Sequence, residues 1–404
     1  MTEEKKFNRW IIVVAAIVIQ MCLGAVYAFS VLSPPIKKQF GWSDVETNLA
    51  FTIALLVFAL SMIPAGRLQD RKGPRLVATL GGVFLGLGMV LSSFASSLLW
   101  LYVSYGIIGG LGIGLGYVTP ISTCVKWFPD KKGLITGLAV FGFGAGSIVF
   151  APMWNYLIDA MHWSWNQTFL ATGILFAALV IPFAQLLKNP CQGYVPPNWK
   201  PPEKSKSAKD YGPGGMLRTI AFFLIWVSYW FGTNAGLMMI GVAKKAAISL
   251  AGYDGATAAL LVSILGLFNA SGRIMWGFAG DKFGREKILT LIFAVCSGAL
   301  FITAIISEPT LFVFGMLLVG LSFGGFLALY PALTADYYGT KSYGMNYGIV
   351  FTAYGAGAVL GPIMAGYIMD TQGSYVPAFY IAGALALVGI LLSVAINRAA
   401  RNIK

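Results

Sequence analysis

Two polar residues, Asn269 and Arg273, lie four positions apart inside a long apolar stretch between residues 255 and 279. Arg273 precedes Asp281 by eight residues, so a helix would carry it roughly 12 Å away from the turn that holds this carboxylate. A guanidinium stays ionised inside a protein and binds a carboxylate as a planar, two-pronged pair. Asn269, one helical turn away on the same face, can bind a hydroxyl or keto oxygen or orient the arginine. The spacing therefore predicts a binding site for a single carboxylate.

The composition indicates that this stretch lies in a membrane. Hydrophobic residues make up 57% of the 404 positions and charged residues only 11%, about half the charge of a soluble globular protein. One crossing takes about 20 apolar residues, and the first apolar segment, of full membrane length, is expected to stay in place. Segments of this kind fall at roughly 10–32, 47–66, 75–94, 98–124, 133–158, 167–187, 216–243, 255–279, 287–307, 310–335, 344–369 and 376–397. We therefore expect an all-α membrane protein with twelve transmembrane helices and no soluble catalytic domain.

These spans place Arg273 close to the bilayer centre, where an ionised side chain costs a few kcal/mol or more and must face protein or water. Every Asp and Glu falls in a loop, a tail or the last turn of a span. An anionic substrate is therefore the expected partner of the guanidinium. Backbone carbonyls and tyrosine hydroxyls could instead satisfy Arg273 without a ligand, and Asn269 could form an ordinary hydrogen bond between helices.

The gap between the sixth and seventh spans divides the chain. Residues 188–215 contain five lysines and six prolines, a composition that cannot bury itself and is typical of a solvated linker. We therefore expect an N-terminal six-helix bundle at 1–187, a cytoplasmic linker at 188–215 and a C-terminal six-helix bundle at 216–404.

The basic residues gather on one side of the spans. All but five of the 28 Lys and Arg residues fall in the two tails, the central linker or the loops on the same side as these. The exceptions are Arg273 within its span and Lys37, Lys38, Lys244 and Lys245 on the other side. Because segments rich in Lys and Arg stay in the cytoplasm, both termini are expected there. The net charge of +13 is then a topology signal, and no nucleic-acid partner is expected.

The two halves repeat with a shift of 211 positions. The segment Gly66-Arg-Leu-Gln-Asp70-Arg71-Lys-Gly73 recurs as Gly277-Phe-Ala-Gly-Asp281-Lys282-Phe-Gly284. The same shift relates Gly109 to Gly320, Gly114 to Gly325, Pro120 to Pro331, Gly137 to Gly348, Gly144 to Gly355, Gly146 to Gly357 and Asp159 to Asp370. Parallel repeats of this kind place a substrate site near the membrane midplane between two pseudo-symmetric bundles.

The repeated loop, G-x-x-x-D-[RK]-x-G, resembles the signature loop of the major facilitator superfamily, and the twelve-span layout agrees along the whole chain. The resemblance implies the major facilitator fold and rocker-switch alternating access, in which the halves tilt about a central site. Each loop carboxylate can accept hydrogen bonds from a neighbouring helix N-terminus, a contact available only when the inner side is closed. We therefore expect gating loops built on Asp70, Arg71, Asp281 and Lys282, with a plain solvated turn as the alternative.

Two tyrosines stand next to repeat-related prolines. Tyr117 precedes Pro120, and Tyr330 directly precedes Pro331, at positions where kinked helices commonly line a central cavity. Each hydroxyl can donate to a carboxylate while the ring packs against a short aliphatic tail. Ordinary packing is the alternative for both.

A narrower resemblance rests on four segments. The chain is similar to the monocarboxylate transporters and their bacterial oxalate/formate antiporter relatives at Tyr27-Ala28-Phe29, Phe40-Gly41-Trp42-Ser43, Trp127-Phe128-Pro129-Asp130-Lys131-Lys132-Gly133 and Asn269-x-x-x-Arg273. In those relatives an arginine of the eighth span, matching Arg273, binds the substrate carboxylate. The resemblance implies a bacterial lactate transporter in the inner membrane.

The chain departs from these relatives at three positions. The dicarboxylate branch has a lysine where Tyr354 stands here, and a single cation favours monoanions over oxalate. The animal transporters have an Asp and a Lys, both implicated in proton coupling, at the positions of Asn269 and Val31. Tyr354 is added to the candidate site on the strength of its match alone.

The expected function is secondary active transport of a small monocarboxylate, L-lactate or a pyruvate-like acid, with a proton. A carboxylate exchanger with the same site and a receptor that binds without transport are the alternatives. An enzyme is not expected, because no nucleophile, base or metal constellation is spaced for catalysis. The four cysteines are isolated, so no metal, cofactor or disulfide framework is expected. A monomer in the lipid bilayer is the expected working form.

Overall fold

The computed structural model describes residues 8–191, 194–196, 199, 210–305 and 308–400. Within these ranges the chain forms helices and no strand, and twelve helices are long and apolar enough to cross a membrane. The predicted all-α architecture and the number of spans are therefore confirmed. Half of the predicted linker, with the basic residues of 200–209, lies outside the described ranges, as do Lys5, Lys6, Arg401 and Lys404.

The first six spans include several helices with a change of helix type inside the membrane. The first span joins α1 (Trp10–Gly24) to α2 (Phe29–Phe40) through the 3-10 turn η2 (Ala25–Ala28). In the fourth span the π-helix η3 (Tyr102–Gly109) stands between α5 (Leu98–Leu101) and α6 (Gly110–Trp127). The fifth joins α7 (Lys132–Asn155) to the π-helix η4 (Tyr156–Ala160). The others are α3 (Asp44–Lys72), α4 (Pro74–Ser92) and α8 (Trp165–Leu186).

The later spans are single long helices. After the short α9 (Pro213–Met216) come α10 (Ile220–Ala251), α11 (Gly255–Phe283), α12 (Arg285–Ile305), α13 (Pro309–Tyr338), α14 (Tyr343–Gln372) and α15 (Val376–Ala400).

Two helices extend further than their apolar segments predict. Lys37 and Lys38 belong to the last turn of α2, and Lys244 and Lys245 lie inside α10. Both helices end at a glycine in the left-handed conformation, Gly41 at φ 72° and Gly252 at φ 70°, which glycine adopts without steric cost. The apolar pattern ends before the lysines, whereas the helical backbone continues to the glycine.

The chain forms two compact units. The first holds Met1–Asp130, Leu138–Pro202 and Thr340–Ile349, and the second holds Lys131–Gly137, Glu203–Gly339 and Val350–Lys404. The first turns of α7 thus belong to the second unit, and the first turns of α14 belong to the first unit. The division into bundles at 1–187 and 216–404 with a linker at 188–215 stays a prediction.

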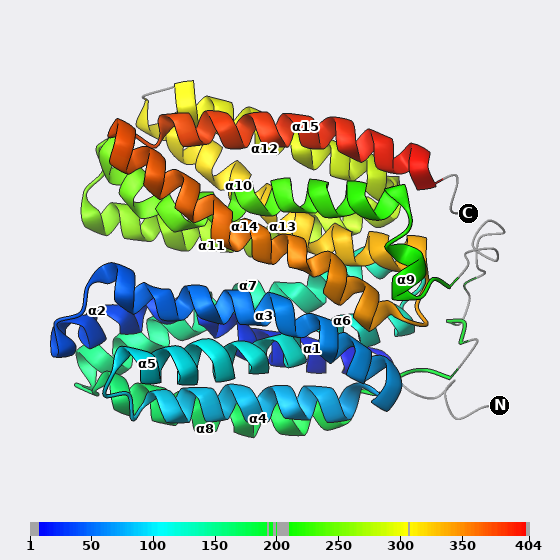
Figure 1. The fold of residues 1–404 in the computed structure, drawn as a ribbon, viewed down its shortest axis with the longest axis horizontal. Coiled ribbons are helices and arrows are strands. Elements are labelled where there is room, and N and C mark those ends of the chain that lie inside the picture. Colours follow the sequence, from blue (N-terminus) through cyan, green and yellow to red (C-terminus); the bar gives the residue numbers. More distant parts are fainter. Residues whose placement is uncertain (1–7, 192–193, 197–198, 200–209, 306–307, 401–404) are drawn as a thin grey trace. The chain divides into compact units, whose positions relative to one another are not determined.

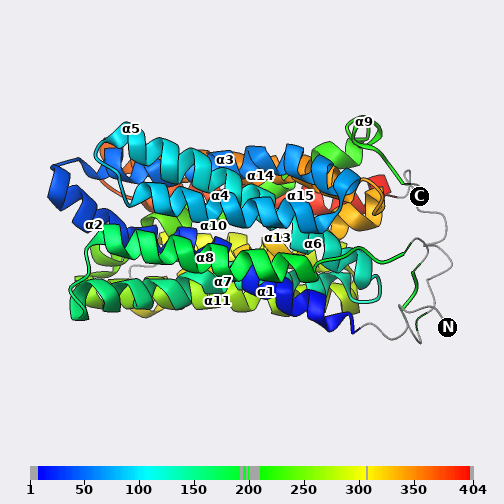
Figure 2. The same cartoon turned by 90° about the horizontal axis from the view of Figure 1, so that it is seen from below.

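Each unit packs its helices along their length. In the first unit α4 lies against α6 and α8, and α3 against α6 (Figures 1 and 2). In the second unit α11 lies against α13, and α12 against α13 and α15 (Figure 1).

Glycines of the third and fourth spans let their backbones meet closely. A Cβ on Gly112 would lie 2.3 Å from the backbone N of Leu85, and one on Gly81 would lie 2.6 Å from that of Gly116. Because these two positions carry no side chain, the backbones of α4 and α6 can approach to van der Waals contact, and a larger residue would not fit there.

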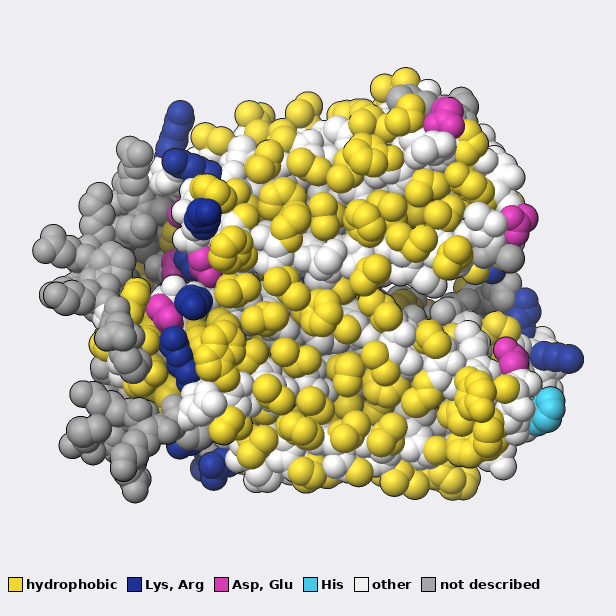
Figure 3. All heavy atoms as spheres, turned by 180° about the vertical axis from the view of Figure 1, so that it is seen from behind, with side chains coloured by type: hydrophobic (Ala, Val, Ile, Leu, Met, Phe, Trp, Pro, Cys, Tyr) yellow, Lys and Arg dark blue, Asp and Glu magenta, His cyan; other side chains and the backbone are white. Residues whose placement is uncertain are grey.

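Side chains are sorted by type along the helices. In the face seen in Figure 3, hydrophobic side chains cover the middle, and the Lys and Arg side chains lie near its left and right edges. This is the surface expected of helices solvated by lipid along their length.

Candidate functional site

Arg273 belongs to the second unit and is fully buried. It stands on α11 with 0% of its surface exposed, and Asn269, one turn earlier, is 4% exposed. The guanidinium Nε donates to the amide Oδ1 of Asn269 at 3.4 Å. The amide therefore fixes one edge of the guanidinium, which is the orienting role that the spacing allows.

Two glycines press against the backbone of α11 at this turn. A Cβ on Gly324 of α13 would lie 2.1 Å from the carbonyl oxygen of Asn269. A Cβ on Gly137, in the first turns of α7, would lie 2.2 Å from the carbonyl oxygen of Arg273. Real Cβ atoms essentially never come this close, so both neighbouring helices reach α11 only because these positions lack a side chain. The turn that carries Arg273 is held by backbone contacts on two sides.

Tyr330 is buried on α13 and already has a hydrogen-bond acceptor. Its hydroxyl donates to Ser228 Oγ at 2.7 Å, and this hydroxyl in turn donates to the carbonyl of Ile225 at 3.1 Å. The ring stacks on Tyr229 with centroids 4.2 Å apart. In this arrangement the Tyr330 hydroxyl can accept a further hydrogen bond, but its proton is engaged.

Tyr354 of α14 belongs to the same aromatic series. Its ring stacks on Phe351 with centroids 4.6 Å apart, and Phe351 lies 6.3 Å from Tyr229. The rings of Tyr330, Tyr229, Phe351 and Tyr354 thus form one continuous row across α13, α10 and α14. Sequence reasoning missed Ser228 and Tyr229, although a Ser-Tyr pair inside an apolar span was a usable signal.

Tyr117 belongs to the first unit. It is buried on α6, and its ring packs edge-on against Phe58 at 5.0 Å and Phe143 at 5.1 Å. The 211-residue shift relates Phe58 to Asn269 and Phe143 to Tyr354. The first unit therefore places an apolar cluster at the repeat positions where the second unit has polar residues.

The repeated loops make matching contacts in both units. Asp70 accepts from the backbone N–H of Gly344 at 3.1 Å and of Met345 at 3.0 Å, at the start of α14. Asp281 accepts from those of Gly133 and Leu134, both at 2.8 Å, near the start of α7. These positions are related by the same 211-residue shift. Each carboxylate therefore satisfies amides at a helix N-terminus, where negative charge is favoured.

Arg71 and Lys282 do not take part in these hydrogen bonds. Both side chains are exposed, and the Lys282 ammonium lies over the ring of Phe283 at 5.3 Å from its centroid. Their predicted contribution to gating stays a prediction.

The loop of the second unit carries ion pairs that sequence reasoning missed. Arg285 pairs with both Asp281 and Asp336, and Lys132 reaches Asp336 at 2.8 Å. In the first unit Asp70 faces Lys126 at 3.8 Å. The shift maps Arg285 onto Pro74, so the repeat pattern did not predict this difference.

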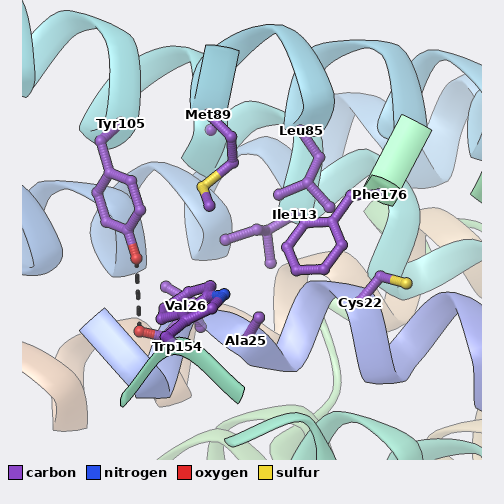
Figure 4. A pocket seen from close by; sticks show the side chains of 10 residues that line it. Cys22, Ala25, Val26, Leu85, Met89, Tyr105, Ile113, Trp154 and Phe176 are labelled. Carbon is purple, nitrogen blue, oxygen red and sulfur yellow. Dashed lines mark hydrogen bonds between the residues drawn. The ribbon is translucent and has the colours of Figure 1, made fainter. Parts of the chain in front are cut away.

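A small cavity in the first unit is a poor substrate site. It has a volume of about 10 Å³, room for roughly one water molecule. Ten residues line it, among them Cys22, Met89, Tyr105, Trp154 and Phe176 (Figure 4). Its walls are almost entirely apolar, with the Tyr105 hydroxyl directed at the carbonyl of Val26 at 3.5 Å. Among the described residues, no cluster of His, Cys, Asp and Glu could hold a metal ion.

Comparison with known proteins decides the family. The model of the Major Facilitator Superfamily matches residues 13–243 and 221–402. The chain belongs to the major facilitator superfamily. Its members are transporters, so the predictions of a membrane transporter and of a protein that is not an enzyme are confirmed.

The relatives of this major facilitator protein include carboxylate transporters. The oxalate:formate antiporter of Oxalobacter formigenes is 28% identical over 98% of this chain and 94% of its own. The MFS-type transporter YhjX of Escherichia coli (strain K12) is 29% identical over 87% of this chain and 86% of its own. Monocarboxylate transporter 13 of Bos taurus is 27% identical over 94% and 87%. The predicted resemblance to the monocarboxylate transporters and the antiporters is therefore confirmed.

Solved structures confirm the fold. The human organic anion transporter MFSD10 superposes with a TM-score of 0.77 over 96% of this chain and 100% of its own, at 13% identity. The transporter FucP in its outward conformation superposes with a TM-score of 0.75 over 96% of this chain and 99% of its own, at 15% identity. At these identities the likeness concerns the fold alone.

The backbone contact at Arg273 generates a stability prediction. We expect Gly137→Ala to lower the melting temperature of the purified protein in detergent, because the new methyl group meets the Arg273 carbonyl oxygen. Forcing an extra carbon into a packed contact costs about 1–3 kcal/mol. Gly266→Ala on α11 is the matched control, since nothing lies within 4 Å of its Cβ. Equal melting temperatures for the two variants would show that the contact is not tight.

Proposed function

We propose that the protein is a secondary active transporter that moves a small monocarboxylate together with a proton by rocker-switch alternating access. The best candidate cargo is L-lactate, and pyruvate-like acids share its chemistry. One observation carries the proposal: the fully buried Arg273, oriented by Asn269, in the middle of α11.

The chemistry of Arg273 selects the substrate class. A guanidinium offers two parallel N–H donors that match the two oxygens of a carboxylate, and it keeps its charge at any physiological pH. Asn269 adds amide groups that can bind a hydroxyl or keto oxygen beside the carboxylate. The names of two relatives, an oxalate:formate antiporter and a monocarboxylate transporter, support carboxylate cargo.

Residues of the second unit favour a monoanion. The aromatic row of Tyr330, Tyr229, Phe351 and Tyr354 supplies hydroxyls and apolar rings but no second cation. A site with one guanidinium, with this aromatic row as its proposed apolar lining, suits a short acid with one charge and a small apolar tail better than a dianion. Tyr117 stays a proposed substrate contact on the strength of its position before Pro120 in the sequence.

The transport cycle follows from charge neutralisation. Binding of the anion to Arg273 offsets the cost of holding a charge inside the protein, which makes the occluded state accessible. In this proposal one proton enters with each anion. Arg273 keeps its own proton, so the pairing of the substrate carboxylate with the guanidinium, and not a carboxylate of the protein, controls proton uptake. Asp70 and Asp281 hold helix N-termini through hydrogen bonds that a change of state must break. Arg71 and Lys282 complete the proposed gating loops.

The decisive variant is Arg273→Ala. Removing one partner of a buried charge pair costs about 2–5 kcal/mol, so we expect uptake of radiolabelled L-lactate into proteoliposomes to fall at least about 30-fold. Arg273→Lys keeps the charge but loses the two-pronged geometry and should be strongly impaired. Lys287→Ala, which removes an exposed cation of α12, should transport like the native protein. Native-like uptake by Arg273→Ala would rule out its role in binding.

The same assay separates symport from exchange. An inward proton gradient should drive uptake, and an uncoupler should abolish it. Uptake that ignores the gradient but requires internal anion would instead establish a carboxylate exchanger.

The hydroxyl pair of Tyr330 and Ser228 tests the second contact. If Tyr330 binds the substrate, Tyr330→Phe should raise the half-saturating concentration by about 2- to 12-fold, the worth of one neutral hydrogen bond. Ser228→Ala should change it by less than about twofold, because it frees the Tyr330 proton without removing the hydroxyl. Equal losses in both variants would mean that the pair has a structural role only.

The proposed location is a bacterial inner membrane, with a monomer whose termini and linker face the cytoplasm. Cys191 is exposed, whereas Cys22, Cys124 and Cys296 are buried, so a single native thiol reports the side. A membrane-impermeant maleimide should label inverted vesicles but not intact cells with an opened outer membrane. Cys191→Ser should abolish labelling. Labelling from outside the cell would reverse the proposed topology.

A further inference from the structure

A second cavity opens in the first unit where three helix ends meet. It has a volume of about 280 Å³ and lies beside the end of α3, the start of α4 and the end of α8. Its lining residues are Lys72, Gly73, Pro74, Arg75, Leu187, Lys188 and Asn189. Three of the seven are cations and none is acidic.

Two cations of this cavity are available to an anion. Among the described residues, neither Lys72 nor Arg75 forms an ion pair with a carboxylate. The Arg75 Nε donates to the carbonyl of Leu187 at 3.2 Å, which ties the guanidinium to the end of α8 and leaves its terminal nitrogens for another acceptor. The carbonyl of Lys188 accepts from the Trp127 indole at 2.6 Å. Hydrogen bonds to two neighbouring carbonyls thus shape the cavity wall.

The backbone adds to the positive potential. The helix α4 begins at Pro74 after Gly73, and no side chain caps its N-terminus. Its first amides and helix dipole favour a negative group at this end. The cavity therefore combines cationic side chains from two chain segments with an uncapped helix start.

The second repeat lacks this arrangement. The 211-residue shift maps Lys72 onto Phe283 and Arg75 onto Glu286. The nearby Arg285 already pairs with Asp281 and Asp336. The second repeat therefore forms the matching junction between two helices without a surplus of positive charge. The fold does not require the cations of the first repeat at this junction.

Apolar side chains exposed beside the cavity point to a lipid. Leu76 of α4 is 46% exposed and Leu186 of α8 is 41% exposed, each next to lining residues and at the end of a span. Val83 and Leu87 continue the exposed apolar face along α4. We propose that this cavity binds the phosphate group of an anionic phospholipid, with the acyl chains lying along α4 and α8.

Binding can be measured without transport. We would titrate phosphatidylglycerol, phosphatidylcholine or inorganic phosphate into the purified full-length protein in neutral detergent, and follow the melting temperature and bound lipid by native mass spectrometry. The native protein should bind phosphatidylglycerol and be stabilised by it, and phosphatidylcholine should have little effect. Lys72→Gln with Arg75→Gln should weaken phosphatidylglycerol binding by about 30-fold.

Controls separate the cavity from general surface charge. Lys244→Gln with Lys245→Gln removes two exposed cations elsewhere and should bind like the native protein. Lys188→Gln, which keeps its backbone contact to Trp127, is a second cavity variant in case the double variant fails to fold. Native-like binding by a folded cavity variant would overturn the proposal. Equal stabilisation by inorganic phosphate would overturn the proposal that the bound phosphate group belongs to a lipid, and would assign the site to a soluble phosphate.

Discussion

A guanidinium cannot release its proton at physiological pH, so the chain must accommodate a permanent charge wherever Arg273 lies. The second unit does this without moving α11 away from its neighbours: Gly324 and Gly137 bring two other helices onto the backbone at this turn. Asn269 then fixes one edge of the guanidinium. The position of the charge along α11 is therefore fixed by close backbone contacts on two sides.

The contacts of the two repeated loops also depend on the backbone. Asp70 and Asp281 bind pairs of amides at helix starts, and a glycine in each pair permits the approach. The ion pairs of the two loops nevertheless differ. Arg285 pairs with both Asp281 and Asp336, whereas the Lys126 ammonium lies 3.8 Å from the Asp70 carboxylate. A conformational change therefore meets different local interactions in the two repeats even though their hydrogen bonds match.

Much of this architecture is predictable from sequence because the membrane enforces it. Twelve spans follow from apolar length alone, and the place of Arg273 inside α11 follows from its distance to Asp281. The ends of α2 and α10 were not predictable from hydropathy, because they depend on the left-handed glycines Gly41 and Gly252. The engagement of the Tyr330 proton by Ser228 was also out of reach, since it depends on which faces of α10 and α13 meet.

The repeats are most informative where they diverge. Several positions that shape the backbone, such as Gly41 with Gly252, Gly137 with Gly348 and the loop carboxylates, are shared across the 211-residue shift, whereas Gly324 corresponds to Ile113. Arg273 instead corresponds to Met62, and Asn269 to Phe58. One repeat thus carries a charged and a polar side chain at the positions where the other carries apolar side chains. Because a duplicated fold starts with equal halves, differences at matched positions mark the chemistry that the fold itself does not require.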